Sequence, residues 1–589
     1  MNLLVQIVQI PIVMYFLILT IIWILIQLLS KLNLNNIRIF IKEKILIITL
    51  VIYLALSLVF TQINITLFPY MHAILIAVIT WMMFYTLQKR IDVFLITTLV
   101  AIFMPIAIMI ATKHPLPLGD DARFPGFAKA IEDDGRWIPY KYSEEPYYQF
   151  YHLIPALEYI LASVTGSGVE NISYYYLMLK FIFYLSYFLL IFLILKSLKI
   201  NDIAPFIGLF LMTLTPPLAL TQIVHQGYAL ILAMTMTYIM LRTLSLRSEV
   251  SILMVCILFV SGIIAHATII VIFLAFLLPL LYLNSYNVEK QKIVRIAGLA
   301  ILISIAYWIG IYYMNIILGQ SISSIISFIN LIFGEATAFH GTAKPWYTQE
   351  QNIYFISWSL VPSIVSSYIL LHPKHLLKIL RKNRTSDPQN LSYTVLLGLL
   401  GLGGTVINFL LRLVPSFGGR YFYWLYILMI PLASMIITGQ RKNLLSLILS
   451  LIIISMAALY GIQDPTLSAN TFGEKIGWAD KNDWKIALSL SHYIDPYISL
   501  WTDPRLGSPL SSLKPLPLLE HTSFKTEQII KIAIIGIDRV GIIGMTKDPR
   551  NVDWFKRNLK IDPMEVPISS LLDNFSVILC IGNYIGIVS

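Results

Sequence analysis

The chain has 589 residues, of which 58% are hydrophobic and only 12% are Asp, Glu, Lys or Arg, and its mean hydropathy is +0.77. Soluble domains carry about 25% charged residues, so this composition excludes an ordinary soluble protein. The net charge of +11 resides in short clusters between apolar segments and indicates no nucleic-acid partner. With two cysteines, neither a disulfide framework nor a cysteine-based metal site is indicated.

Apolar segments long enough to cross about 30 Å of hydrocarbon recur along residues 1–461. We therefore expect an all-α polytopic membrane protein with about fourteen transmembrane helices. The first segment has no basic region before it and no small-residue cleavage site after it, so we interpret it as a retained helix rather than a signal peptide. The expected spans are 3–29, 45–68, 70–88, 92–112, 172–195, 203–222, 224–243, 251–265, 267–284, 296–318, 352–371, 392–411, 421–438 and 443–461.

Basic residues cluster in every second connection between these spans, which predicts the orientation of the chain. The clusters hold 20 of the 42 Lys and Arg residues and lie at 31–44, 89–90, 196–199, 242–247, 290–295, 372–384 and 441–442. These connections are predicted to face the cytoplasm. The N-terminus, the outer loops 113–171 and 319–351, and residues 462–589 are then extracytoplasmic.

One apolar run, 251–284, allows two interpretations. It is either one long helix or a hairpin that turns near His266. A hairpin keeps the first outer loop and the C-terminal residues on the same side of the membrane, whereas one long helix would separate them.

The first outer loop holds the stretch from Gly119 to Tyr147, with eleven charged residues, seven of them acidic. Asp120 and Asp121 follow the helix-breaking HPLPLG within a few residues of the predicted membrane surface. Two adjacent carboxylates held there are well placed to meet the headgroup of a lipid substrate. Residues 132–134 are also acidic, but they precede a glycine turn and are interpreted as a solvated surface.

The remainder of this loop predicts a helix lying in the membrane interface. The segment YYQFYHLIPALEYILASVTG is apolar but is interrupted by His152, Pro155 and Glu158. It is too short and too polar to span a bilayer, and it suits a helix in the headgroup region.

Residues 462–589 differ from the rest of the chain and predict a small extracytoplasmic α/β domain. They carry 13 basic and 14 acidic residues among short apolar runs. The stretch 480–494 is typical of an amphipathic helix, and PYISLWT, KIAIIGIDRVGIIG and FSVILCIGNYIGIV are typical of strands.

Two segments carry a resemblance to a known family. GDDARFPGFAKAIEDDGRWIP and the following EEPYYQFYHLIPALEYILASVTG resemble the first outer loop of GT-C glycosyltransferases such as protein O-mannosyltransferases and the aminoarabinose transferases of lipid A, with Tyr147 replacing a second proline. GGRYFYWLYILMIPLAS, residues 418–434, is similar to the Arg-Tyr segment that opens a late helix in these enzymes. The resemblance covers about 115–243 and 417–439.

The resemblance implies a GT-C fold and an inverting transfer of a sugar from a dolichyl or undecaprenyl phosphate to an extracytoplasmic acceptor. That acceptor is a protein, a lipid or a glycan of the cell envelope. It implies that Asp120, or else Asp121, is the general base, because a carboxylate must take the proton of the acceptor.

Cations are expected around the leaving phosphate. Arg420 with Tyr421 is the first candidate, since guanidinium matches phosphate oxygens in a fork. Lys180 lies within an expected span, where an ammonium is costly unless it has a function, although snorkelling to the interface also explains it. Arg123 serves the same role or pairs with Asp121.

Other polar residues lie near the outer rim of the expected membrane domain and are candidates for acceptor contacts as well as for purely structural roles. They are Glu144, Glu145, His152, His225, His266 and Glu335. No spacing typical of a metal site is present, so a divalent cation is neither excluded nor supported, and no cofactor is indicated.

Three alternatives stay open. An oligosaccharyltransferase-like enzyme is the alternative within the family, although its W-W-D-Y-G motif is missing from the sequence. A transporter or lipid flippase would show repeats and ionisable residues deep inside spans, and Lys180 is the one such residue among the expected spans. A non-catalytic scaffold would not need an acidic pair beside the membrane.

Overall fold

The computed structural model describes residues 11–29, 123–136, 153–166, 172–200, 202, 204–213, 225–246, 251–266, 269–283, 288–310, 349–381, 389–411, 422–439, 500–502, 532–536, 576–581 and 584–588, with a few single positions between 485 and 513. The expected spans 45–68, 70–88, 92–112 and 443–461 lie outside these residues. The chain divides into two compact units. Unit 1 comprises 1–113, 181–221 and 226–467, and unit 2 comprises 114–180, 222–225 and 468–589.

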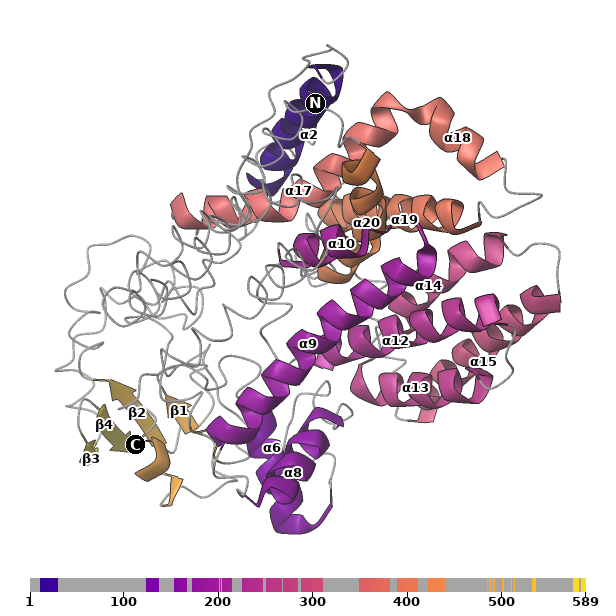
Figure 1. The fold of residues 1–589 in the computed structure, drawn as a ribbon. Coiled ribbons are helices and arrows are strands. Elements are labelled where there is room, and N and C mark those ends of the chain that lie inside the picture. The colour runs from indigo at the N-terminus through magenta and orange to yellow at the C-terminus, as the bar shows by residue number, and fades with distance from the viewer. Residues whose placement is uncertain are drawn as a thin grey trace, which may run out of the picture. The chain divides into compact units, whose positions relative to one another are not determined.

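Unit 1 is built from helices (Figure 1). Its described helices are α2 (Pro11–Leu29), most of α9 (Ile172–Leu198), α10 (Ala204–Thr213), all but the first residue of α12 (His225–Leu246), α13 (Ser251–Ala265), α14 (Ile269–Leu283), α15 (Val288–Gly310), α17 (Gln349–Leu371), α18 (Pro373–Arg381), α19 (Gln389–Leu411) and α20 (Phe422–Gly439).

Most of these helices coincide with segments that the apolar pattern predicts. The bounds of α9, α12, α13, α14, α17, α19 and α20 differ by at most a few residues from the expected ones. Within the described parts of the chain, however, no helix combines the length and the hydropathy that a membrane span requires. The helices are therefore observed, and the number of spans stays a prediction.

The run 251–284 is a hairpin and not one long helix. α13 ends at Ala265, and α14 begins at Ile269. The rings of Phe259 and Phe273 lie 5.4 Å apart, whereas fourteen residues of a continuous helix would separate them by about 21 Å. Of the two interpretations of this run, the structure agrees with the hairpin, which keeps the first outer loop and the C-terminal residues on the same predicted side of the membrane.

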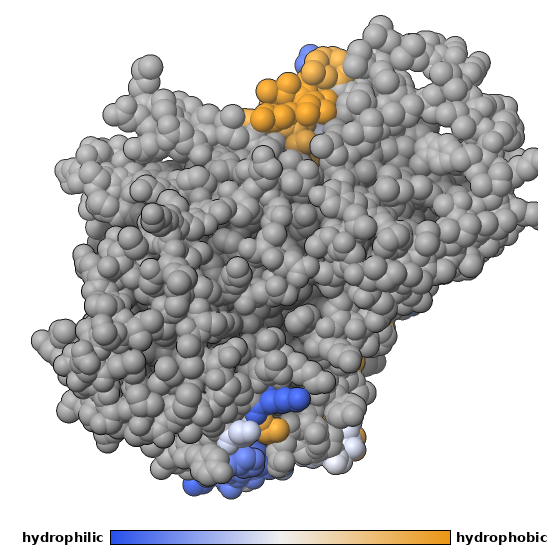
Figure 2. Space-filling view, turned by 90° about the vertical axis from the view of Figure 1, so that its left-hand side faces the viewer, coloured by the Kyte–Doolittle hydropathy of each residue, from blue (hydrophilic) through white to orange (hydrophobic). Residues whose placement is uncertain are grey.

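Two helix pairs of unit 1 pack closely together. α2 packs along α17, where the Thr20 and Ser366 hydroxyls lie 3.1 Å apart and Ser363 donates a hydrogen bond to the Phe16 carbonyl, 3.1 Å away. The opposite side of α2 is an exposed apolar patch, seen at the top of Figure 2, to which Leu17, Ile18, Ile21, Leu25 and Leu28 contribute.

The second pair, α19 and α20, approaches closely because glycines of α19 face α20. A Cβ atom at Gly398 or Gly404 would lie within 2.5 Å of a leucine side chain of α20, and one at Gly401 would lie 2.8 Å from the Leu425 carbonyl oxygen. Small residues at helix contacts allow this approach between backbones. The pair fixes the direction of α20, whose first residue follows the candidate residues Arg420 and Tyr421.

In unit 2, the structure describes the helices α6 (Arg123–Asp134) and α8 (Leu153–Thr165), the first residues of α9 and a small sheet. The helices α6 and α8 pack on each other. The sheet has the order β1-β2-β4-β3, with β1 (Leu500–Thr502), β2 (Ile532–Gly536), β3 (Ser576–Ile581) and β4 (Tyr584–Val588).

The strands lie in the stretches that the sequence predicts as strands. β1 and β2 are parallel, and β4 pairs antiparallel with both β2 and β3. Residues 485, 487–489 and 491 are helical, in agreement with the expected helix at 480–494. The domain boundary at residue 462 stays a prediction.

Candidate functional site

Most of the candidate site residues lie outside the part of the chain that the structure describes. This holds for Asp120, Asp121, Glu144, Glu145, His152, Glu335, Arg420 and Tyr421. Arg123, Lys180 and His225 belong to helices, with Arg123 opening α6 and His225 opening α12. The expected approach of Asp120 to Arg420 therefore stays a prediction, and the site can be built from α6, α8 and the His266 turn.

α6 begins two residues after Asp121, so the acidic pair immediately precedes a helix. The first turn of a helix presents unpaired N–H groups and a partial positive charge, which favour carboxylates at this position in the sequence. Pro125 lies in that first turn, where the missing N–H is tolerated. The sequence therefore joins the predicted catalytic acids directly to a rigid element.

The apolar side of α6 is buried against α8. Its buried hydrophobic residues are Phe124, Phe127, Ala128, Ala130 and Ile131. Their spacing of three and four residues places them on one face of a helix. Because this face of α6 is buried, packing holds α6 in place. The residues that precede α6 in the sequence are therefore attached to a fixed helix.

The charged residues at the end of α6 bind one another. The Lys129 ammonium lies 2.6 Å from a Glu132 carboxylate oxygen and 3.2 Å from one of Asp133. Partial burial lowers the pKa of Lys129, but the hydrogen bonds and charges of the two carboxylates outweigh it, so the pKa is raised. Gly135 follows with φ of +66°, as expected of a glycine that ends a helix. Glu132 and Asp133 are exposed, in agreement with the prediction of a solvated surface before a glycine turn.

α8 has an unusual distribution of side chains. Glu158 is fully buried, on the same face as Ile154 and Ala162, whereas Ile160 is 53% exposed and Val164 is 79% exposed on the opposite face. A helix at a water-facing surface exposes polar residues and buries apolar ones, whereas α8 buries Glu158 beside Ile154 and exposes Ile160 and Val164 beside Ser163. An outward apolar face fits the predicted helix in the membrane interface, and it is the strongest structural support that the described residues give to that prediction.

Glu158 is a residue that the candidate set omits. A buried carboxylate is costly unless the protein compensates its charge, so its position facing the α6–α8 core is not incidental. Glu158 lies in a mainly apolar segment, four residues from both Ile154 and Ala162. This spacing is the sequence signal that could have identified Glu158 as a buried candidate residue.

His266 is the candidate whose surroundings are described. It joins α13 to α14, its backbone N–H donates to the Gly262 carbonyl at 2.9 Å, and its own carbonyl accepts from the N–H of Ile269 at 3.1 Å. The residue is 7% exposed. These bonds are made by the backbone and place His266 in the hairpin turn. The role of its side chain stays a prediction.

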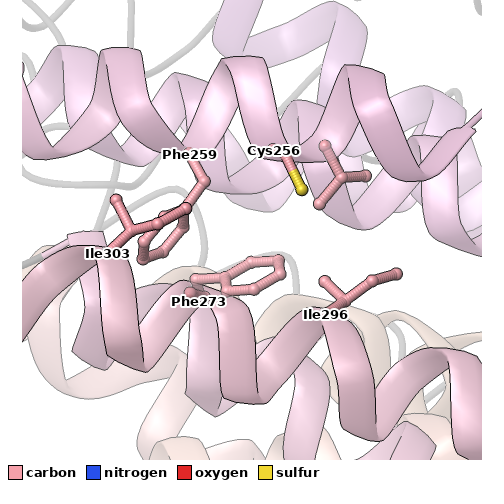
Figure 3. A pocket seen from close by; sticks show the side chains of 7 residues that line it. Cys256, Phe259, Phe273, Ile296 and Ile303 are labelled. Atoms are coloured by element: carbon pink, nitrogen blue, oxygen red, sulfur yellow. The ribbon is translucent and has the colours of Figure 1, made fainter.

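Next to this hairpin, a narrow apolar gap lies between α13, α14 and α15 (Figure 3). It is lined by Val255, Cys256, Phe259, Phe273, Ile296, Ala300 and Ile303 and has no room for a water molecule. Without a charged or strongly polar side chain it offers no chemistry, and we interpret it as a packing defect. Among the described residues, no cluster of three or more His, Cys, Asp or Glu could hold a metal ion.

No protein-family model and no curated protein matches this sequence. The structure is similar to the crystal structure of ArnT from Cupriavidus metallidurans bound to undecaprenyl phosphate, with a TM-score of 0.43 and 10% identity, covering 85% of this chain and 98% of that chain. It is also similar to ArnT from the same organism in the apo state, with a TM-score of 0.42 and 12% identity, covering 84% of this chain and 98% of that one. At these scores neither likeness identifies the reaction of this chain.

Proposed function

We propose that this chain is a membrane glycosyltransferase of the GT-C type. It transfers one sugar from a polyprenyl phosphate to an acceptor on the extracytoplasmic side of the membrane. The observation that carries the proposal is the order of elements in the first outer loop. An acidic pair directly precedes α6 in the sequence, α6 packs on α8, and α8 exposes the apolar side chains of Ile160 and Val164.

This order supports the reaction because it meets the two needs of a lipid-linked donor. The sugar must lie at the membrane surface, since its polyprenyl chain stays in the bilayer, and the exposed Ile160 and Val164 suit the adjoining interface. The base must be close to that surface and preorganised, and the packed α6 provides a fixed start for the segment that holds Asp120.

In the proposed reaction, Asp120 accepts the proton of the acceptor hydroxyl while that oxygen forms a bond to the anomeric carbon. The bond from the anomeric carbon to the phosphate oxygen breaks, and polyprenyl phosphate leaves with the electron pair. Attack from the opposite side inverts the configuration of the sugar. Asp121 adds negative charge beside the developing oxocarbenium ion, as carboxylates do in glycosidases.

The negative charge on the leaving phosphate grows during this step and requires fixed cations. We assign this role to Arg420, with Tyr421 beside it, because a guanidinium binds two phosphate oxygens at once. Lys180 and Arg123 are the further candidates. Donor, acceptor and leaving group thus meet at the membrane surface, and the acceptor is a protein, lipid or glycan.

The decisive experiment measures release of polyprenyl phosphate by the full chain in lipid nanodiscs. The donors are mannose and aminoarabinose on dolichyl or undecaprenyl phosphate. Loss of a general base reduces turnover by about 10² to 10⁴-fold, so Asp120→Asn is expected to show a loss of this size. Asp121→Asn is expected to show a smaller loss, since its carboxylate takes no proton.

Asp133→Asn is the matched control. Asp133 belongs to the same acidic stretch but is exposed and bound to Lys129, so this substitution is expected to leave turnover unchanged. Unchanged turnover in both Asp120→Asn and Asp121→Asn would refute the mechanism, and absence of phosphate release with every donor would refute the reaction.

A further inference from the structure

α18 is a short basic helix between α17 and α19, two helices of unit 1 on which it packs. Its apolar residues Leu376 and Ile379 are buried, and the Ser392 hydroxyl of α19 donates a hydrogen bond to the Ile379 carbonyl at 3.1 Å. The Leu376 N–H donates to the His372 carbonyl at 3.1 Å, which joins α18 to the end of α17. α18 is therefore a fixed element of the fold.

The outer side of α18 carries positive charge. Lys374, His375 and Lys378 are exposed, and at 100° per residue they lie opposite Leu376 and Leu380 on the helix. The segment 371–386 contains five Lys or Arg residues and two His but no acidic residue. The uniform sign of this charge fits the cytoplasmic side of a membrane, and it also makes an anionic surface a complementary partner.

Exposed apolar side chains adjoin this charge. Leu377 on α18 is 51% exposed, and Leu370 at the end of α17 is 63% exposed. Lysines next to exposed leucines are the arrangement found where a helix meets a bilayer surface, since the ammonium groups reach the headgroups and the leucines reach the acyl chains.

We propose that α18 binds the headgroups of anionic lipids and fixes the end of the α17–α19 pair to one membrane surface. By the charge pattern of the connections, this surface is the cytoplasmic one. The proposal requires that the chain resides in a membrane, but it does not depend on the transfer reaction. The partner follows from charge complementarity, because several cations on one fixed helix attract a surface of many negative charges rather than one ion.

The test titrates the full chain in detergent with phosphatidylglycerol and, separately, with phosphatidylcholine, and measures the rise in Tm. We expect phosphatidylglycerol alone to raise the Tm, and to do so less at high salt because salt screens exposed charges. Each lysine near an anionic surface contributes about fivefold in affinity. Lys374→Glu with Lys378→Glu should therefore raise the half-maximal lipid concentration by more than about 25-fold, because two fivefold contributions are lost and two repulsive charges are added.

The matched control exchanges Lys196 and Lys199 for Glu, since both are exposed at the end of α9 and lie on the same predicted side. An equal loss in both pairs would overturn the proposal, because general charge would then explain the binding. An equal response to phosphatidylglycerol and phosphatidylcholine, or an equal response to soluble glycerol phosphate, would overturn it too. If the Glu pair does not fold, Lys374→Gln with Lys378→Gln decides, with an expected loss of about 25-fold, because two fivefold contributions multiply.

Discussion

At residue 401, α19 approaches α20 so closely that no side chain fits. A Cβ at this position would lie 2.8 Å from the Leu425 carbonyl oxygen, and a backbone atom cannot move aside as the end of a side chain can. We expect Gly401→Ala to destabilise the protein by about 1–3 kcal/mol, as overpacking of a filled core does. The measurement is the Tm of the purified chain.

Gly403 provides the control for this prediction, because it lies in the same helix and a Cβ there would have no atom within 4 Å. Gly403→Ala removes backbone freedom without a clash and is expected to stabilise by up to about 1 kcal/mol. A Tm for Gly401→Ala as high as that of Gly403→Ala would show that the two helices do not approach as closely as described.

The glycines of α19 that face α20 show how far the contacts of single residues can be predicted from the sequence alone. The segment 389–411 is mainly apolar, so its helix is predictable from the sequence. Its partner helix is not, because the positions of Gly398, Gly401 and Gly404 do not indicate which helix packs against them. Glu158 was missed for a related reason. A carboxylate within an interfacial helix is easily interpreted as solvated, and its burial depends on tertiary packing, which the composition does not indicate.

At the level of elements, the long apolar helices and the short helix α8 were predicted, whereas the short helices α6 and α18 were not. α17, α19 and α20 coincide with expected segments because each is a long run of mainly apolar residues. α15 begins eight residues before its expected segment, since Val288–Arg295 is charged but continues the helix. α6 and α18 were expected as charged connections. Helices of 12 and 9 residues gain their stability from packing on neighbours rather than from propensity, and hydropathy does not report that packing.

α8 is the element whose surroundings can be measured directly. A spin label at Val164→Cys, on the exposed apolar face, is expected to be more accessible to oxygen, which concentrates in acyl chains, than to a polar relaxation agent. A label at Asp133→Cys, on the exposed charged side of α6, is expected to show the opposite preference. The measurement is power-saturation electron paramagnetic resonance in liposomes with Cys256 and Cys580 replaced by Ser.

These two labels differ in the face on which they lie, while both belong to the same pair of packed helices. Equal accessibility of both positions to the polar agent would place the outer face of α8 in water. The interfacial helix would then be wrong, and with it the main structural support for a lipid-linked donor.

At the level of the whole molecule, the hairpin at His266 decides whether an even or an odd number of expected spans separates the loops on either side of it. Between α9 and α18 the structure describes six helices that coincide with expected spans, α10, α12, α13, α14, α15 and α17. If each crosses the membrane once, an even number separates Lys196 from His375, and both residues lie on one side. One long helix in place of α13 and α14 would have put them on opposite sides.

Single cysteines in a background with Cys256 and Cys580 replaced by Ser test this arrangement. Asp133→Cys is expected to react with a membrane-impermeant maleimide on intact cells, because the first outer loop is predicted to be extracytoplasmic. Lys196→Cys and His375→Cys, both exposed, are expected to react only after the cells are permeabilised. Labelling of Lys196→Cys and His375→Cys from opposite sides would mean that an odd number of helices between them crosses the membrane. Labelling of Asp133→Cys only from inside would show that the first outer loop is cytoplasmic. The acids proposed for catalysis would then lie on the wrong side of the membrane for the acceptor.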